Sequence, residues 1–113
     1  MFKITPNPTF TIPVEIPVPG GAGTETLKVV YKHLGRKKFN ELVDKLKDIT
    51  DLDLMETIIA GWEGADAPYS RETLDNLLDN YPMSSRALWE AYLATFAWAA
   101  EKNSSTPPAT GQT

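Results

Sequence analysis

Residues 10–18 carry the feature that most constrains the fold: an apolar side chain at every even position and a proline at two of the odd ones. Strict alternation of this kind is typical of a half-buried β-strand. Pro13 and Pro17 share the polar phase, so both lack a backbone N–H on the same lateral side of the strand. Only the other side can pair fully with a neighbour. The pattern therefore predicts an edge strand.

The neighbouring strand is predicted at residues 24–33, where Leu27, Val29 and Tyr31 occupy alternate positions. The connecting residues 19–23 read Pro-Gly-Gly-Ala-Gly, and glycine allows the positive φ angles that a hairpin loop needs. Because two strands alone are marginally stable, we expect helices to cover their apolar face.

After Gly35 the apolar period becomes helical, and four helices are expected. The apolar stripe of the first is Phe39, Leu42, Val43, Leu46 and Ile49. The second is capped by Thr50 or Asp51, carries the stripe Met55, Ile58, Ile59 and Trp62, and is ended by Gly61 and Gly64. The third runs from a Ser70 cap to Pro82, and the fourth from Ser84 or Ser85 to about Lys102.

These elements predict an α+β fold in which an N-terminal β-hairpin packs against a mainly helical domain of about four helices. Residues 1–102 form a single domain in this prediction. Residues 103–113 have no apolar period and are expected to form a disordered C-terminal tail.

Composition excludes several classes of function. The 113-residue chain has no cysteine, which excludes disulfide scaffolds, zinc–thiolate sites and cysteine nucleophiles, and it has a single histidine. The acids Asp51, Asp53 and Glu56 sit at a predicted helix start, where the helix dipole favours them without a metal. No catalytic motif is present, so we expect a protein that is not an enzyme and needs no cofactor or metal. A formal charge of −4 and the lack of a long apolar run argue against nucleic-acid and membrane partners.

Charge is distributed unevenly along the chain. Residues 28–47 hold seven basic and two acidic side chains, whereas residues 48–113 hold eleven acidic and three basic ones. Arg36, Lys37 and Lys38 cluster at a predicted helix start, where the helix dipole disfavours cations. Two interpretations stay open: the basic helix lies against acidic helices or faces water, or its basic cluster docks an acidic partner.

The last helix has more apolar surface than a simple amphipathic pattern requires. Its broad apolar face consists of Leu88, Trp89, Tyr92, Leu93, Phe96, Ala99 and Ala100, with its centre near Phe96. Trp98 falls well outside that arc, beside Ala87, Ala91 and Ala94. Trp98 either covers the helix end or forms, with the alanines, a surface for a partner or for self-association.

The chain resembles the tail assembly chaperones of long-tailed bacteriophages. The resemblance covers about residues 25–103 and rests on motifs in a fixed order: Gly61-Trp62-Glu63-Gly64, Ala67-Pro68-Tyr69-Ser70, Leu74-Asp75-Asn76-Leu77-Leu78-Asp79, Tyr81-Pro82, Ala91-Tyr92 and Lys102-Asn103. The loop between Gly64 and Pro68 looks shorter than in many relatives.

The resemblance implies a non-enzymatic role: binding the long helical tape-measure protein, keeping it in solution, and assisting the tail-tube protein to polymerise around it. It also implies that the protein works in the bacterial host cytoplasm and is left out of the mature virion. The alternative from another class is a structural tail component, such as a tail-tube or completion protein.

Overall fold

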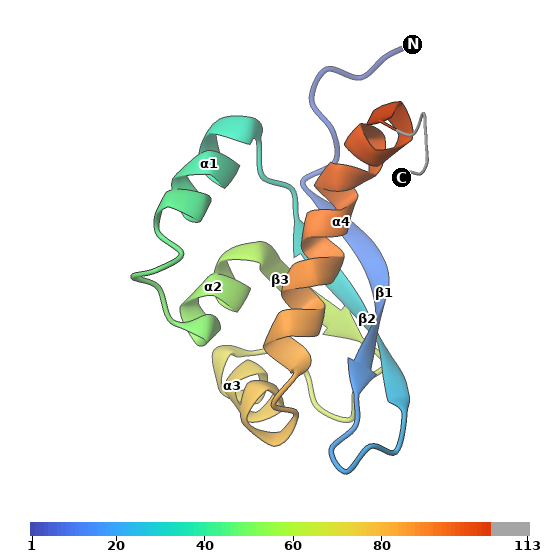
Figure 1. The fold of residues 1–113 in the computed structure, drawn as a ribbon, viewed down its shortest axis with the longest axis vertical. Helices are drawn as coiled ribbons and strands as arrows, with labels where there is room; N and C mark the ends of the chain where they lie inside the picture. Colours follow the sequence, from blue (N-terminus) through green and yellow to red (C-terminus); the bar gives the residue numbers. More distant parts are fainter. Residues whose placement is uncertain (105–113) are drawn as a thin grey trace.

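A computed structural model describes the backbone of residues 1–104 and the side chains of residues 1–96. The elements, in chain order, are β1 (Thr9–Pro17), β2 (Thr24–Lys32), α1 (Arg36–Asp44), α2 (Asp51–Ile58), β3 (Ile59–Glu63), α3 (Arg71–Asn80) and α4 (Ser84–Ser104). Figure 1 shows the helices gathered on one side of a small sheet, with α4 crossing it. The α+β prediction, with an N-terminal hairpin and four helices, is confirmed. The predicted tail at 103–113 lies outside the described residues from 105 onward.

The β1–β2 hairpin forms as the alternation predicts. The antiparallel register places Val14 opposite Leu27 and Phe10 opposite Tyr31, and Gly20, Gly21 and Gly23 in the loop all have positive φ. The strand order is β1-β2-β3, so β1 lies at an edge. Both prolines of β1 are therefore in a strand that pairs on one side, and the edge prediction is confirmed.

The third strand was not predicted from the sequence. The expected second helix through Trp62 is wrong: α2 ends at Ile58, and β3 pairs antiparallel with β2, placing Trp62 opposite Val29 and Glu63 opposite Lys28. The adjacent β-branched residues Ile58 and Ile59, with Gly61 two positions later, disfavour continuation of the helix. Pairing with the open side of β2 then stabilises the extended chain.

The first helix is also shorter than its apolar stripe. α1 ends at Asp44, and the N–H groups of Lys45, Leu46 and Asp48 each donate to the carbonyl three residues earlier, at 2.9–3.2 Å. Such bonds tighten the chain into turns and stop the α-helical ladder. Leu46 and Ile49 continue the apolar period from these turns, which is why the stripe predicts a longer helix than the structure has.

The other helix starts follow the sequence closely. Thr50 caps α2 by accepting a hydrogen bond from the Asp53 N–H at 3.2 Å. Ser70 and Thr73 form a reciprocal capping box at the start of α3. α4 begins at Ser84 and ends two residues beyond the expected end at Lys102.

The core lies between the sheet and the helices. Its fully or nearly fully buried residues are Val14, Ile16, Val29, Tyr31, Leu42, Leu54, Met55, Ile58, Ile59, Leu74, Leu88 and Tyr92. Tyr31 of β2 and Tyr92 of α4 lie 5.1 Å apart between ring centroids, and Phe10 of β1 stacks on both. This aromatic cluster fixes α4 across the hairpin.

Candidate functional site

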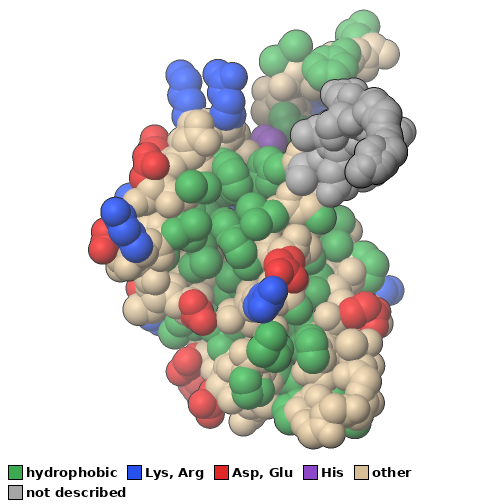
Figure 2. Space-filling view, in the orientation of Figure 1, with side chains coloured by type: hydrophobic (Ala, Val, Ile, Leu, Met, Phe, Trp, Pro, Cys, Tyr) green, Lys and Arg blue, Asp and Glu red, His purple; other side chains and the backbone are tan. Residues whose placement is uncertain are grey.

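An apolar surface lies between α1 and α4, where Figure 2 shows hydrophobic side chains gathered into one area. Phe39 of α1 stacks on Phe96 of α4 with ring centroids 4.4 Å apart, and Trp89 lies 6.4 Å from Phe39. Val43, one helical turn after Phe39, is 41% exposed, and Phe96 is 36% exposed. We call Phe39, Val43, Trp89 and Phe96 the α1–α4 apolar face. Contiguous apolar surface of this kind is typical of protein-binding sites.

The sequence pattern places Val43 and Phe96 in the core, and the structure contradicts both predictions. The burial of α4 centres on Leu88 and Tyr92, which are completely inaccessible, rather than on Phe96. Within α1 only Leu42 is buried, because this helix lies at the margin of the molecule, away from the sheet (Figure 1). Both helices therefore carry more apolar surface than the fold covers.

The predicted basic cluster borders this face. Arg36, Lys37 and Lys38 are all exposed at the start of α1, which has no acidic residue in its first turn and no side-chain cap from Gly35. Arg36 lines the same surface hollow as Phe39 and Phe96. Basic side chains project where α1 begins (Figure 2). Among the described residues, none of the three enters an ion pair.

The predicted alanine ridge on α4 is only partly at the surface. Ala87 and Ala91 are half-buried and pack against the core, while Ala94 is exposed. Trp98 belongs to α4, but its side chain lies outside the described part. Of the three alanines, Ala94 is thus the one that the structure exposes.

The sheet-facing side of α4 is held by two buried tyrosines. The Tyr31 hydroxyl donates to the Leu88 carbonyl at 2.8 Å, and the Tyr92 hydroxyl donates to the Lys32 carbonyl at 2.9 Å. Burial raises the pKa of Tyr92 to about 12, and burial together with the neighbouring Tyr92 raises the pKa of Tyr31 as well. Both phenols therefore remain protonated at neutral pH and act as hydrogen-bond donors that lock the helix in place.

The acids at the start of α2 have protein partners. Arg71 of α3 forms an ion pair with Asp53, at 2.9 Å, and with Glu56, while Ser85 of α4 donates to Asp51 at 3.1 Å. These contacts join α2 to α3 and α4. Within the described residues, no group of three or more acidic or histidine side chains is placed to hold a metal ion. The helices described there also lack the combination of length and hydropathy that a membrane crossing requires.

The sequence contains a signal for the α1–α4 apolar face, but the same signal predicts buried core. Phe39 and Val43 lie four residues apart on a helix whose other positions are charged, apart from Asn40 and the buried Leu42. Phe96 lies one turn beyond Tyr92. Periodicity identifies one apolar side of each helix, but it does not tell how much of that side another element covers.

In a comparison with known protein families, a model described as phage tail assembly chaperone matches residues 1–103. This range contains every residue of the α1–α4 apolar face and of the basic cluster. No curated protein and no solved structure matches the chain.

Proposed function

Since the chain belongs to the phage tail assembly chaperone family, we propose that it binds the tape-measure protein and assists the tail-tube protein to polymerise around it. The observation that carries this proposal is the α1–α4 apolar face. A long helical client exposes apolar stripes that aggregate unless they are covered, and an apolar surface between two helices suits such a stripe.

The structure supports a binding mode in which the client helix lies along the α1–α4 apolar face. Phe39 and Trp89 supply half-buried aromatic surface, and Val43 and Phe96 supply apolar surface already in contact with water. Covering these side chains stabilises the complex without opening the core, which continues inward from this face through the contact of Phe96 with Tyr92. Modest affinity at each site, repeated over many copies along one client, would permit release when tube protein arrives.

Two further groups extend this proposed site. Arg36, Lys37 and Lys38 favour a client segment that carries acidic residues beside its apolar stripe, because exposed charges act mainly on the rate and orientation of association. Trp98 and the exposed Ala94 each lie two residues from Phe96 along α4, about half a helical turn, and would provide a second contact or allow self-association.

Co-expression with the tape-measure protein tests the proposal. The wild-type chain should increase the soluble fraction of the client and co-purify with it, and the double variant Val43→Ser/Phe96→Ser should lose most of both effects. Met83→Ser is the matched control, because Met83 is 48% exposed but lies in the turn before α4, outside the apolar face. Equal behaviour of the double variant and the wild type would contradict the proposed site.

Purified phage particles provide the second test. A chaperone that acts in the host cytoplasm should be absent from mature particles, since the client passes on to the assembled tube. Recovery of the chain in particles at a fixed stoichiometry would instead identify a structural tail component.

A further inference from the structure

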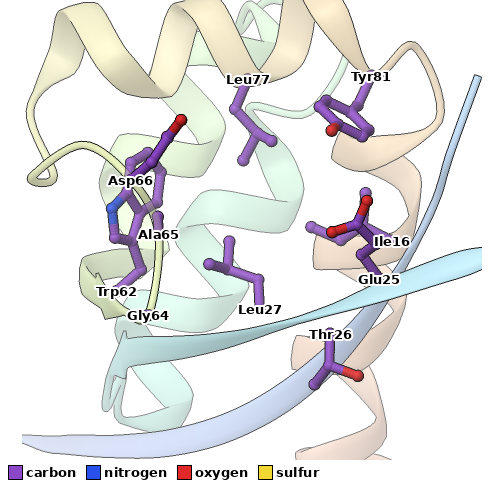
Figure 3. A pocket seen from close by; sticks show the side chains of 10 residues that line it. All are labelled: Ile16, Glu25, Thr26, Leu27, Trp62, Gly64, Ala65, Asp66, Leu77 and Tyr81. Atoms are coloured by element: carbon purple, nitrogen blue, oxygen red, sulfur yellow. The ribbon is translucent and has the colours of Figure 1, made fainter.

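A cavity lies between β2, the loop after β3 and the end of α3, in the part of the molecule opposite to the start of α1 (Figures 1 and 3). Its volume is about 390 Å³, within the ~300–1,000 Å³ range of small-ligand pockets. Leu27 and Leu77 face each other across it, and Trp62 and Tyr81 form further walls (Figure 3). All four side chains are half-buried, so the cavity has an apolar and aromatic interior that water reaches.

The aromatic wall is held rigidly. The Trp62 indole N–H donates to the Ala67 carbonyl at 2.9 Å, and Tyr69 packs edge-on against the indole with ring centroids 5.0 Å apart. The Tyr69 hydroxyl in turn donates to the Ile59 carbonyl at 3.2 Å. Because β3 and its following loop fix the indole from both ends, the pocket is formed before a ligand arrives, which reduces the entropy cost of binding.

Two carboxylates flank this apolar interior. Asp66 lies on the Trp62 side and Glu25 on the opposite side, beside Ile16 (Figure 3). No lysine or arginine lines the cavity, and among the described residues neither acid enters an ion pair. Thr26 points away from the cavity, and its hydroxyl donates to Glu15 on the other face of the sheet. The charge in the pocket is therefore negative and locally uncompensated.

We propose that this pocket binds a lysine or arginine side chain projecting from the helical protein that the chaperone holds. The aliphatic stem would pack on Leu27 and Leu77, and the cationic head would reach one of the two carboxylates, either Asp66 beside the Trp62 ring or Glu25 on the opposite side. A neutral apolar side chain would fill the same space but leave both carboxylates without a partner, and an acidic one would be repelled. The identity of the partner rests on the function proposed above, whereas the chemistry of the pocket does not.

The pocket itself is tested by NMR on the full chain, with n-butylguanidinium as the probe and the neutral isostere n-butylurea as its control. The Trp62 indole N–H signal, assigned through Trp62→Phe, should shift saturably as n-butylguanidinium is added. From these titrations, the protein should bind n-butylguanidinium about tenfold more tightly than n-butylurea. Equal binding of the two compounds, or no saturable shift with n-butylguanidinium, would overturn the proposal.

Variants locate the effect. Glu25→Gln/Asp66→Asn should weaken n-butylguanidinium binding about tenfold and leave n-butylurea unaffected. Glu72→Gln/Asp75→Asn removes the same charge from exposed positions of α3 that do not line the cavity, and should leave both titrations unchanged. If both double variants weaken n-butylguanidinium binding equally, overall charge rather than the pocket binds the cation, and the assignment is overturned.

The partner is tested with the same doubles in co-purification with the tape-measure protein. The Glu25→Gln/Asp66→Asn chain should retain several-fold less client than Glu72→Gln/Asp75→Asn. If the pocket double retains as much client as its control, the client does not use the pocket and the proposal fails. If even the wild-type chain retains no client, the proposed function fails, and the n-butylguanidinium titration still decides whether the pocket binds a cationic side chain.

Discussion

The apolar face of α4 has two adjoining parts, one packed on the sheet and one facing α1, and they use aromatic residues in different ways. On the sheet side, the hydroxyls of Tyr31 and Tyr92 are bonded to backbone carbonyls, and both side chains are fully buried. On the α1 side, Phe39 and Phe96 stack with no polar group to satisfy, and part of their surface faces water. Directional bonds on the first side fix the fold. The α1 side has no such bonds, and its exposed apolar surface is of the kind that another apolar helix can cover reversibly.

The largest expected effect comes from the sheet side. Tyr92→Ala removes a ring that packs on Phe10 and Tyr31 and opens a cavity under α4, so it should lower the free energy of unfolding by about 3–5 kcal/mol. Urea denaturation followed by far-UV circular dichroism measures this change. A loss below about 1 kcal/mol would show that the sheet side is not the part that holds α4.

Alkaline pH should weaken the same side. The pKa of Tyr92 is raised by burial to about 12 from an ordinary value of 10.0, and that of Tyr31 is raised too. The folded state therefore holds these protons more tightly than the unfolded chain does. Their stabilisation is complete below pH 10 and is lost as the pH rises toward 12. The urea midpoint should fall across this interval in the wild type and fall less steeply in Tyr92→Phe. Parallel pH profiles would contradict the assignment.

On the α1 side, a substitution should affect client binding much more than it affects stability. Phe96→Ala should lower the free energy of unfolding by about 1 kcal/mol, because the ring is partly exposed already. The same change should reduce co-purification of the tape-measure protein several-fold. If Phe96→Ala destabilises the fold as strongly as Tyr92→Ala, the two sides of α4 do not differ in the way described above.

The ion pairs between α2 and α3 should matter less than either aromatic group. Arg71 and both of its acidic partners are substantially exposed, so solvent and salt screen the attraction. Arg71→Gln should give a smaller loss of stability than Phe96→Ala, and raising the salt concentration should reduce the difference from wild type. A loss that does not respond to salt would indicate a packing role for the arginine stem.

The basic cluster should have the smallest effect on stability. Neutralising Arg36, Lys37 and Lys38 together should leave the urea midpoint unchanged, since no described ion pair includes them. Association with the client should become slower and less dependent on salt. Stopped-flow measurements at low and high salt test this, and unchanged association rates would reject a role for the cluster in capture.

The sequence predicts the fold where a local signal has one meaning. The Pro13 and Pro17 positions identify an edge strand, and Ser70 identifies a helix start, because missing donors and capping oxygens act within a few residues. The prediction fails at Trp62, because the helix signal of Met55, Ile58 and Ile59 competes with pairing to β2, which is remote in the sequence. Pairing with β2 outweighs the local preference for helix, so the segment forms a strand.

The candidate site is less predictable for a related reason. Phe39, Val43 and Phe96 carry the same signature as core residues, and only the placement of α1 away from the sheet exposes them. The pocket near Trp62 depends on β3 and on the loop that follows it, so it could not be foreseen without the third strand. Surface that remains after packing is a property of the whole arrangement rather than of one helix.

The proline-bearing edge of β1 affects which proteins can associate with this sheet. A sheet whose outer strand lacks donors at Pro13 and Pro17 is a poor template for a further strand. A chaperone surrounded by unassembled subunits gains from such an edge, since backbone pairing would bind extended segments of other proteins nonspecifically, whatever their side chains. With backbone pairing blocked at this edge, any attachment there depends on contacts between side chains.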